Sequence, residues 1–415
     1  MQQLAIEGGP KVRTSDWPER AKRFDKQELK HLKQALQQNT LFYMYGQKTK
    51  QMCRKMARLC GAKHVVPCSS GSAAIHGAIK ACDVGPGDEV ITSPITDAGT
   101  ILGIVYEGAL PVFADVDPRT YSITAKSIEE RITARTRAVV VVHLAGCPAD
   151  IKPIVRLCKR RDIRLIEDCA QSWCAKVSSR WVGTFGDLGC FSLNDFKHIT
   201  AGDGGLIVTD NEELYRRAWL SVDKCYDRID GKRSLPFAAP NYRISELQSA
   251  VAIAQLGKVR KITSARNTLG RRLGEKLSDV PGVLPHRVIP DAYATWWFYL
   301  IQIEPERLGA DAPAFAEAVA AEGIPVSAGY VQPVYLTYEY LRRKSAFNHS
   351  QWPFTQARKS LRYEKGYCPD AERVMQNVVF FPLREELSAR EIDDTAAAVR
   401  KVAGCYAERR GARTA

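Results

Sequence analysis

The chain has 415 residues, of which 45% are hydrophobic and 26% are charged, without a low-complexity or collagen-like tract. This composition is typical of a globular enzyme, and the length suffices for about two or three domains. No apolar run approaches the roughly 20 residues that span a bilayer, and the first residues lack the build of a signal peptide. We therefore expect a cytoplasmic protein without a membrane partner.

The charge and the cysteine content bear on two other classes of protein, namely nucleic-acid-binding proteins and proteins with metal sites built from cysteines. The formal net charge is +14, but the basic clusters are dispersed over the polar faces of expected helices, and no nucleic-acid-binding motif accompanies them; the clusters are Lys159–Arg161, Arg271–Arg272, Arg342–Lys344 and Arg409–Arg410. We expect no nucleic-acid partner. The twelve cysteines show no C-x-x-C spacing, so we predict buried free thiols and no metal site.

Residues 1–60 are polar, follow a helical pattern and contain no expected strand. Asp25 is placed to cap a helix in which Leu29, Leu32 and Leu36 share one face. We predict an N-terminal helical arm that packs against another part of the protein, because it has no strand of its own.

From His64 onward, short apolar segments alternate with helical ones. The expected strands are 65–67, 89–92, 111–114 and 138–143, and the expected helices are 73–81, 97–107, 128–132 and 151–162. Such alternation indicates an α/β domain with a mostly parallel sheet and helices on both faces. The apolar run Ala138–Val142 suits a strand that is buried on both sides.

Two places in this region have residues suited to binding a ligand. Residues 68–72 form a Ser/Gly turn that opens onto a helix, so backbone N–H groups, hydroxyls and the helix dipole would favour an anion. The turn lacks the Walker and G-x-G-x-x-G patterns, and a plain helix cap is the alternative interpretation. Asp168 stands where the strand 164–168 ends, at the edge where ligands bind in open α/β folds.

The stretch Gly189–Gly205 places a lysine between two expected strands. The first strand ends at Ser192, Lys197 follows five residues later, and a glycine-rich turn leads into the strand 206–209. A lysine in this position cannot bury its charge cheaply, so its charge must be paired or removed. Schiff-base formation with an aldehyde cofactor would remove it; a surface lysine in a loop is the alternative.

The remainder of the chain begins with a long helix at 244–277, introduced by Asn241–Arg243. The turn-rich segment Val280–Pro285 predicts a domain boundary. After it we expect strands at 296–301 and 378–382, a bend at 324–326, and helices at 311–322 and 388–407. We therefore predict an arm (1–60), a large cofactor-binding domain (61–280), a smaller α+β domain (281–408) and a frayed tail (409–415).

Pyridoxal phosphate would explain these features together. Its phosphate needs hydrogen-bond donors, its ring nitrogen needs a carboxylate and its aldehyde needs a lysine. The turn at 70–73, Asp168, Ser192 and Lys197 supply such groups. A protonated ring accepts the electrons that an amino acid retains when its α-proton leaves.

Eight segments occur in a characteristic order: Ser70–Ala74, Gly85–Ile91, Pro111–Asp117, His143–Asp150, Glu167–Ser172, Phe191–Lys197, Gly202–Gly205 and Asn241–Gln248. Together they resemble the DegT/DnrJ/EryC1/StrS sugar aminotransferases, a branch of the fold-type I pyridoxal phosphate enzymes, over about residues 20–405. The resemblance implies the family fold, with a large, mostly parallel α/β/α sheet domain and a smaller α+β C-terminal domain.

The resemblance also implies a role for each matching residue. Lys197 forms the internal aldimine and later moves a proton between the α-carbon and the cofactor. Asp168 pairs with the pyridine nitrogen, and Gln171 lies near the 3-hydroxyl group of the ring.

The phosphate is expected to be held by Ser72, the backbone N–H of Ala73 and Ser192. Asn241 is similar to the residue that reaches the phosphate of the neighbouring subunit in this family. The resemblance therefore implies a homodimer with shared active sites.

Four positions depart from the family pattern. Where relatives carry an aromatic residue that stacks on the cofactor ring, this chain has Asp97, which we expect to face a hydroxyl or ammonium group of a polar substrate. Trp173 and Cys174 replace the commoner His-Gly pair and are expected to add bulk near the cofactor. Asp203 replaces a glutamate in the glycine turn, which is a mild exchange.

We predict an aminotransferase that moves an amino group from glutamate or glutamine to a keto-sugar or keto-cyclitol, in antibiotic or polysaccharide biosynthesis. A lyase of the same family that aromatises an aminoshikimate-type precursor also keeps the lysine, and is the first alternative. The related dehydratases carry His instead, and His198 should not substitute for Lys197, since neighbouring residues of a strand point to opposite faces. A non-catalytic regulatory protein is the second alternative, which the intact Lys197 disfavours.

Overall fold

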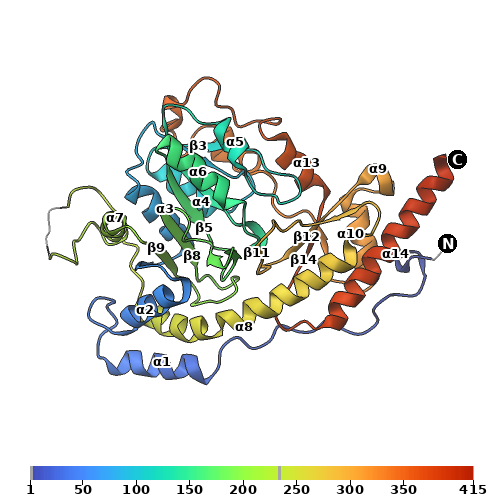
Figure 1. Cartoon of the computed structure of the whole chain (residues 1–415), viewed down its shortest axis with the longest axis horizontal. Coiled ribbons are helices and arrows are strands. Elements are labelled where there is room, and N and C mark those ends of the chain that lie inside the picture. Colours follow the sequence, from blue (N-terminus) through green and yellow to red (C-terminus); the bar gives the residue numbers. More distant parts are fainter. Residues whose placement is uncertain (1–2, 232–234, 415) are drawn as a thin grey trace.

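The centre of the computed structural model, which describes residues 3–231 and 235–414, is a seven-stranded sheet (Figure 1). Its strands, in spatial order, are β1 (His64–Cys68), β9 (Gly205–Thr209), β8 (Leu188–Ser192), β5 (Arg164–Asp168), β4 (Thr136–Val142), β2 (Glu89–Thr92) and β3 (Leu110–Phe113). Neighbouring strands are parallel except at β9, which runs antiparallel to both β1 and β8. The predicted mostly parallel sheet is confirmed.

Helices cover both faces of this sheet, because alternate residues of each strand point to opposite sides. In β4, Ala138 and Val140 pack on the face covered by α3 and α7, whereas Val139 and Val141 pack on the face covered by α6 and α8. The helices of this part are α3 (Gly71–Ala81), α4 (Ala98–Tyr106), α5 (Ala125–Glu129), α6 (Ile151–Arg161), α7 (Glu212–Val222) and α8 (Glu246–Leu277). The helix expected at 128–132 begins earlier, since Thr124 caps it.

A second, antiparallel sheet has the order β10 (Val283–Pro285), β12 (Tyr299–Ile303), β14 (Val378–Phe381) and β13 (Ser327–Ala328). Its core includes residues from α10 (Ala312–Ala321) and α14 (Ala389–Thr414). This arrangement is the predicted α+β part. The remaining elements are a small sheet of β11 (Ala292–Tyr293), β6 (Lys176–Val177) and β7 (Arg180–Trp181), the helices α9 (Pro305–Leu308), α11 (Val334–Thr337), α12 (Glu339–Arg342) and α13 (Pro369–Asn377), and the 3-10 turns η1 (Ala5–Glu7), η2 (Leu144–Gly146) and η3 (Phe354–Gln356).

Two boundaries in this part differ from the prediction. The strand expected at 296–301 begins at Tyr299, because the chain turns at Trp296, which has a positive φ of 45°. The expected frayed tail is wrong for residues 409–414, since α14 continues to Thr414. An ion pair of 2.6 Å between Arg409 Nη2 and Glu7 Oε2 helps to fix this end of the helix. Ala415 lies outside the described residues.

The N-terminal arm forms α1 (Lys26–Gln37) and α2 (Lys48–Cys60), which lie along α8 (Figure 1). Asp25 caps α1 as predicted, and Glu28 completes a reciprocal capping box. The apolar face of α1 is turned outward, with Leu29 70% exposed and Leu36 63% exposed. The arm therefore packs through its other side and leaves apolar surface uncovered in the single chain.

We retain the division into an arm, a large domain, a small domain and a tail as a proposal. Packing crosses its borders at several places. Leu4 packs in the core of the second sheet, and residues of the segment 334–375 such as Tyr335 and Val374 pack in the core of the first. Helix α8 runs from one core to the other (Figure 1).

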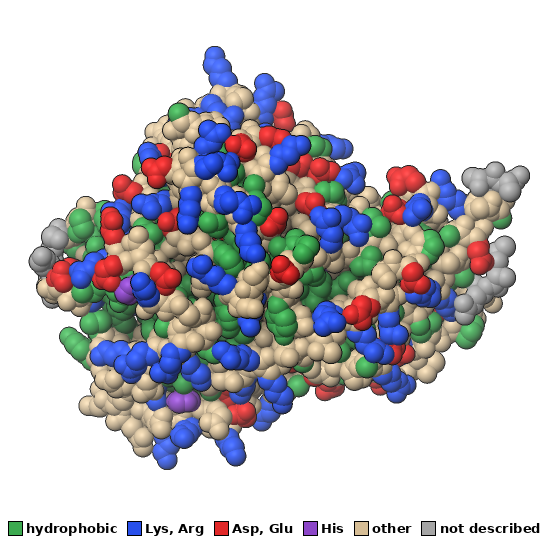
Figure 2. Space-filling view, viewed as in Figure 1, with side chains coloured by type: hydrophobic (Ala, Val, Ile, Leu, Met, Phe, Trp, Pro, Cys, Tyr) green, Lys and Arg blue, Asp and Glu red, His purple; other side chains and the backbone are tan. Residues whose placement is uncertain are grey.

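The charged side chains are dispersed and the cysteines are free thiols, as predicted. Lys and Arg side chains are spread over the visible face with Asp and Glu among them (Figure 2), and several residues of the basic clusters form ion pairs, such as Arg161 with Glu129. All twelve cysteines lie within the described residues, are free, and are buried except for the half-buried Cys53. Within residues 3–231 and 235–414, no helix combines the length and apolar character needed to cross a membrane.

Candidate active site

A cavity of about 210 Å³ lies at the carboxyl ends of β5 and β8, beside the start of α3. It brings together five of the seven predicted site residues, namely Ser72, Asp168, Gln171, Ser192 and Lys197. Its other lining residues are Ser70, Gly71, Ile75, Thr96, Asp97, Gly99, Thr100, Ala170, Asn194 and Asp203. A larger cavity of about 400 Å³ lies at the opposite edge of the sheet and contains none of the predicted residues.

The start of α3 forms one end of the cavity. Ser70 is the N-cap, and its Oγ accepts a hydrogen bond of 3.0 Å from the N–H of Ala73. A Cβ added to Gly71 would lie 2.7 Å from Cβ of Ser192, so only glycine lets the helix start approach the end of β8 this closely. The N–H of Ala73 is bonded to Ser70 in this structure. Its predicted bond to a phosphate stays a prediction.

Asp168 presents a buried carboxylate to the cavity. Its Oδ2 accepts a hydrogen bond of 2.8 Å from Oγ1 of Thr100, and its Oδ1 accepts one of 3.0 Å from the N–H of Ala170. Burial raises the pKa of this carboxyl group, while the two hydrogen bonds and the charge of Lys197 act in the opposite direction. Both oxygens are held in place, which is what a group that orients a protonated ring nitrogen requires.

Lys197 lies in the loop between β8 and β9, and its Nζ is 3.9 Å from the centroid of the Trp297 ring. Burial lowers the pKa of its ammonium group, and the carboxylates of Asp168 and Asp97 oppose that effect. A lowered pKa increases the fraction of free amine near neutral pH, which is the reactive form.

His198 is buried on the far side of this loop, where its Nε2 hydrogen bonds the carbonyl oxygen of Thr295 at 3.1 Å. Our reason for separating it from Lys197 was wrong in one respect, because the two residues lie in a loop and not in a strand. The loop is anchored to Thr295 through His198 and leaves Lys197 at the cavity.

Gln171 is fixed at both ends of its amide. Its Oε1 accepts a hydrogen bond of 2.8 Å from the N–H of Ala145, and its Nε2 donates one of 3.3 Å to the hydroxyl of Tyr330. Sequence reasoning missed Tyr330, Thr100 and Trp297, which come from three other parts of the chain. For Thr100, the available signal in the sequence was its place as a polar residue in the first turn of the otherwise apolar helix α4.

Of the four residues that depart from the family pattern, two line the cavity and two do not. Asp97 lines the cavity and caps α4, since its Oδ1 accepts a hydrogen bond of 2.9 Å from the N–H of Gly99. Asp203 also lines the cavity and accepts a hydrogen bond of 3.0 Å from Nδ2 of Asn194. Trp173 and Cys174 are buried and do not line the cavity. The indole N–H of Trp173 donates a hydrogen bond of 2.9 Å to the carbonyl oxygen of Ser192, which does line it, so the ring lies behind the cavity wall.

Replacing Asp97 with Asn should lower the pKa of Lys197 further, because the carboxylate of Asp97 raises that pKa. Asn also caps helices well, so the start of α4 should remain intact. We expect the pH midpoint for modification of Lys197 by an amine-reactive reagent, followed by mass spectrometry, to move to lower pH. Asp203→Asn, which changes another acid of the same cavity, is the control. An equal midpoint in both variants would show that the charge of Asp97 does not reach Lys197.

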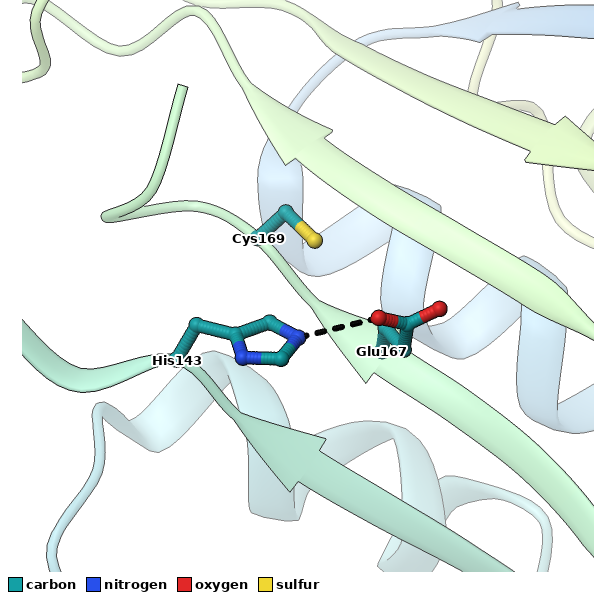
Figure 3. A group of neighbouring side chains, drawn as sticks. All are labelled: His143, Glu167 and Cys169. Carbon is teal, nitrogen blue, oxygen red and sulfur yellow. Dashed lines mark hydrogen bonds and ion pairs between the residues drawn. The ribbon is translucent and has the colours of Figure 1, made fainter. Parts of the chain in front are cut away.

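His143, Glu167 and Cys169 form a buried group (Figure 3). Glu167 and Cys169 are the sequence neighbours of Asp168. Nδ1 of His143 accepts a hydrogen bond from the N–H of Ala149, so Nε2 carries the proton and donates it to Oε2 of Glu167 at 3.0 Å. The carboxylate of Glu167 also accepts three backbone hydrogen bonds, from residues 183, 185 and 186. Burial raises the pKa of the Cys169 thiol. These donors and acceptors are used within the protein, which favours a structural role over a metal site.

Asn241 is exposed and is not among the residues that line the cavity. The segment that carries it nevertheless lies beside the Ser/Gly turn, since the carbonyl oxygen of Tyr242 accepts a hydrogen bond of 2.7 Å from the N–H of Ser69. The hydroxyl of Tyr242 hydrogen bonds Nδ1 of His76 in α3 at 2.9 Å. Asn241 is thus held on the surface next to the predicted phosphate site without entering the cavity of its own chain.

Comparison with known proteins adds four findings. The model of the DegT/DnrJ/EryC1/StrS aminotransferase family matches residues 22–400. An L-glutamine:2-deoxy-scyllo-inosose aminotransferase of Streptomyces kanamyceticus is 37% identical over 296 residues, 68% of each chain. A UDP-N-acetyl-3-dehydro-alpha-D-glucosamine 3-aminotransferase of Acidithiobacillus ferrooxidans is 31% identical over 369 residues, 86% of this chain and 89% of that protein. The solved structure of a 3-amino-5-hydroxybenzoic acid synthase has a TM-score of 0.79 at 25% identity, and the match covers 95% of this chain and 99% of the synthase.

Proposed function

The chain belongs to the DegT/DnrJ/EryC1/StrS aminotransferase family, and we propose that it moves an amino group from glutamate or glutamine to a keto-sugar or keto-cyclitol, with pyridoxal phosphate bound at Lys197. The relative from Streptomyces kanamyceticus is named for glutamine and a cyclitol. The relative from Acidithiobacillus ferrooxidans is named for a nucleotide-linked keto-sugar. These names support the class of donor and acceptor.

The groups that line the cavity fit pyridoxal phosphate. Hydroxyl groups of Ser72 and Ser192 lie at the start of α3, where helix N–H groups favour a phosphate. Gly99 keeps this end open, since a Cβ there would lie 2.4 Å from Oγ of Ser72. The buried carboxylate of Asp168 and the amine of Lys197 supply the other two groups. Bound here, the cofactor would provide a ring that accepts electrons from the reacting carbon.

Each side chain would then have one task. Asp168, fixed by Thr100 and Ala170, would keep a proton on the ring nitrogen. The amine of Lys197 would take the α-proton of the donor and return it to the cofactor carbon that carries the aldehyde group. Gln171, held by Ala145 and Tyr330, would present its amide to the ring hydroxyl.

The observation that carries the proposal is that Lys197 and Asp168 meet in one cavity although 29 positions separate them in the numbering. The test is to incubate the cofactor-loaded protein with single amino acids and to measure the keto acid formed and the loss of visible absorbance. We expect conversion of glutamate or glutamine. Failure of the whole panel of amino acids to react would contradict the proposal.

The aromatising synthase remains the second candidate, since the fold matches the 3-amino-5-hydroxybenzoic acid synthase with a TM-score of 0.79. An aminotransferase from Psychrobacter cryohalolentis matches the fold about equally, with a TM-score of 0.81. A synthase would convert an aminoshikimate-type substrate without consuming an amino donor. Product formation from that substrate in the absence of glutamate and glutamine would therefore favour the synthase. A cytoplasmic location, without nucleic-acid or membrane partners, remains part of our proposal.

We further propose a homodimer in which Asn241 of one subunit donates a hydrogen bond to the phosphate bound by the other. The exposed position of Asn241 next to the turn at 69–72 supports this proposal. The uncovered apolar residues Leu29 and Leu36 of α1, and Phe196 next to Lys197, provide surface for a second copy.

Replacing Asn241 with Ala should weaken cofactor binding by about ten- to a hundred-fold, because a charge-assisted hydrogen bond contributes about 1.5–3 kcal/mol. The fold should persist, since the side chain is exposed. Equilibrium binding of pyridoxal phosphate measures the effect, and Asn377→Ala, at the end of α13, is the matched control. Mixing Lys197→Ala with Asn241→Ala subunits should restore one complete site per heterodimer. A fully active monomer would contradict the shared site.

A further inference from the structure

The loop that carries Lys197 is held from outside by side chains. Between β8 and β9 it forms no ladder with a neighbouring strand, so its backbone carbonyls need other donors. Four consecutive carbonyl oxygens, those of residues 195–198, each accept a hydrogen bond from a side chain. The donors of these four bonds are Arg23 of the N-terminal arm and Trp297, which precedes β12. Arg20 adds a longer bond of 3.4 Å to the carbonyl oxygen of Asp195.

Arg23 supplies three of these bonds. Its Nη1 donates to the carbonyl oxygen of Asp195, and its Nη2 donates to those of Lys197 at 2.7 Å and His198 at 3.2 Å. The Arg23 side chain is only 13% exposed, and burial lowers the pKa of its guanidinium group. Burying a charge is costly unless it is hydrogen-bonded, and the loop carbonyls provide these acceptors. Arg23 is therefore committed to the shape of this loop.

Trp297 holds the loop from the other side in two ways. Its indole N–H donates to the carbonyl oxygen of Phe196 at 2.6 Å, and its ring lies 3.9 Å from Nζ of Lys197. The N–H bond fixes the main chain next to the lysine, and the ring offers a cation–π contact to the ammonium group. One side chain thus contacts the carbonyl group that precedes Lys197 and the amine at the end of its side chain.

The backbone of Arg23 is itself held by hydrogen bonds from α8, and α8 also bonds the loop. The carbonyl oxygen of Arg23 accepts hydrogen bonds from Nε2 of Gln255 at 3.1 Å and Nζ of Lys258 at 3.0 Å. Oε1 of Gln255 accepts a bond of 3.3 Å from the N–H of Thr200 in the same loop. The arm, α8 and the loop therefore form one closed hydrogen-bonded network around Lys197.

We propose that Arg23 and Trp297 are positioning residues that hold the main chain on both sides of Lys197 so that its amine stays at the cavity. The proposal rests on Lys197 being the cofactor lysine of the proposed function. It assigns a task to the N-terminal arm, which contributes no residue to the lining of the cavity. The bonds of Arg23 come from the same chain, so this task is present in each subunit.

The test compares full-length variants by hydrogen exchange and by kinetics. Arg23→Met should accelerate amide exchange in residues 193–204 by about tenfold or more, because the bonds from Lys197 N–H to Asn194 and from Ala201 N–H to Leu193 would open more often. Peptides from β8 and β9 should not change. We expect kcat to fall while KM for the amino donor stays within about twofold, since the donor does not contact Arg23. Arg23→Lys can still donate to carbonyl oxygens, so it should restore part of the slow amide exchange and part of kcat.

Matched controls separate this role from a general loss of stability. Arg20→Met removes the same charge from the neighbouring part of the arm, where Arg20 makes only a long bond of 3.4 Å to Asp195, and should leave exchange in 193–204 unchanged. Trp297→Phe keeps a ring beside Lys197 but loses the N–H donor, and should accelerate exchange in the loop. Trp219→Phe, whose indole N–H is unpaired among the described residues, should not.

The two exchange measurements decide the proposal even if Arg23→Met fails to fold, because Trp297→Phe tests the same loop from the other side. Exchange in 193–204 that is no faster in Arg23→Met and Trp297→Phe than in their controls would overturn it. Failure of the unaltered protein to bind pyridoxal phosphate would instead contradict the proposed function. The exchange result would then still decide whether the two residues hold the loop.

Discussion

Replacement of Lys197 by Met should abolish covalent binding of pyridoxal phosphate and reduce turnover by at least about a thousandfold, since the amine both binds the cofactor and transfers the proton. Met has a similar length and can still pack against Trp297, so the fold should persist. In the unaltered protein, borohydride should fix the cofactor on Lys197. Peptide mass spectrometry identifies the labelled residue.

The pH dependence of this labelling follows from the lowered pKa of Lys197. A group whose pKa is lowered releases its proton at lower pH, so free amine is available below the usual lysine value of about 10.4. In the cofactor-free protein, the pH midpoint for modification of Lys197 by an amine-reactive reagent should therefore lie below that usual value. Lys126 on α5 is exposed and lies outside the cavity. Lys126→Met is the control for turnover and should retain full activity. Borohydride labelling of a different lysine would refute the assignment.

Replacement of Asp168 by Asn should reduce turnover by about a hundredfold or more while leaving the cofactor attached to Lys197. A carboxylate raises the pKa of a neighbouring cationic group by roughly 1–3 units, and an amide does not. The ring nitrogen would then lose its proton more easily, and the ring would accept electrons less well. Steady-state kinetics and the visible spectrum of the bound cofactor measure the two effects separately.

The structure indicates why this substitution should be tolerated. The oxygen of Asn can still accept the hydrogen bond from Ala170, and the hydroxyl of Thr100 can accept from the new amide because Thr100 also hydrogen bonds Thr96 at 2.7 Å. Asp97→Asn makes the same chemical change in the same cavity and should retain much more of the turnover. Equal losses of turnover in the two variants would mean that Asp168 acts only through the negative charge it adds to the cavity, and not through a bond to the ring nitrogen.

The sequence by itself determined the alternating strands and helices of the large sheet and the order of the chemical groups on them. Apolar runs such as Ala138–Val142 can be buried on both faces only in a covered, mostly parallel sheet, so local pattern and fold agree. Asp168 and Ser192 were placed correctly at strand ends for the same reason. The resemblance of the segments around Lys197 added the cofactor, which the family match supports.

Only the tertiary structure decided how the lysine loop is held and where the departures from the family pattern lie. Arg23, Gln255 and Trp297 are separated by long stretches of sequence, and their hydrogen bonds to one loop leave no local pattern. Burial decided the place of Trp173, which packs against Phe191 behind β8 and not in the cavity. The apolar residues of α1 recur with the helical period although they face outward. Such a period shows that residues share one face of a helix, but it does not show what covers that face.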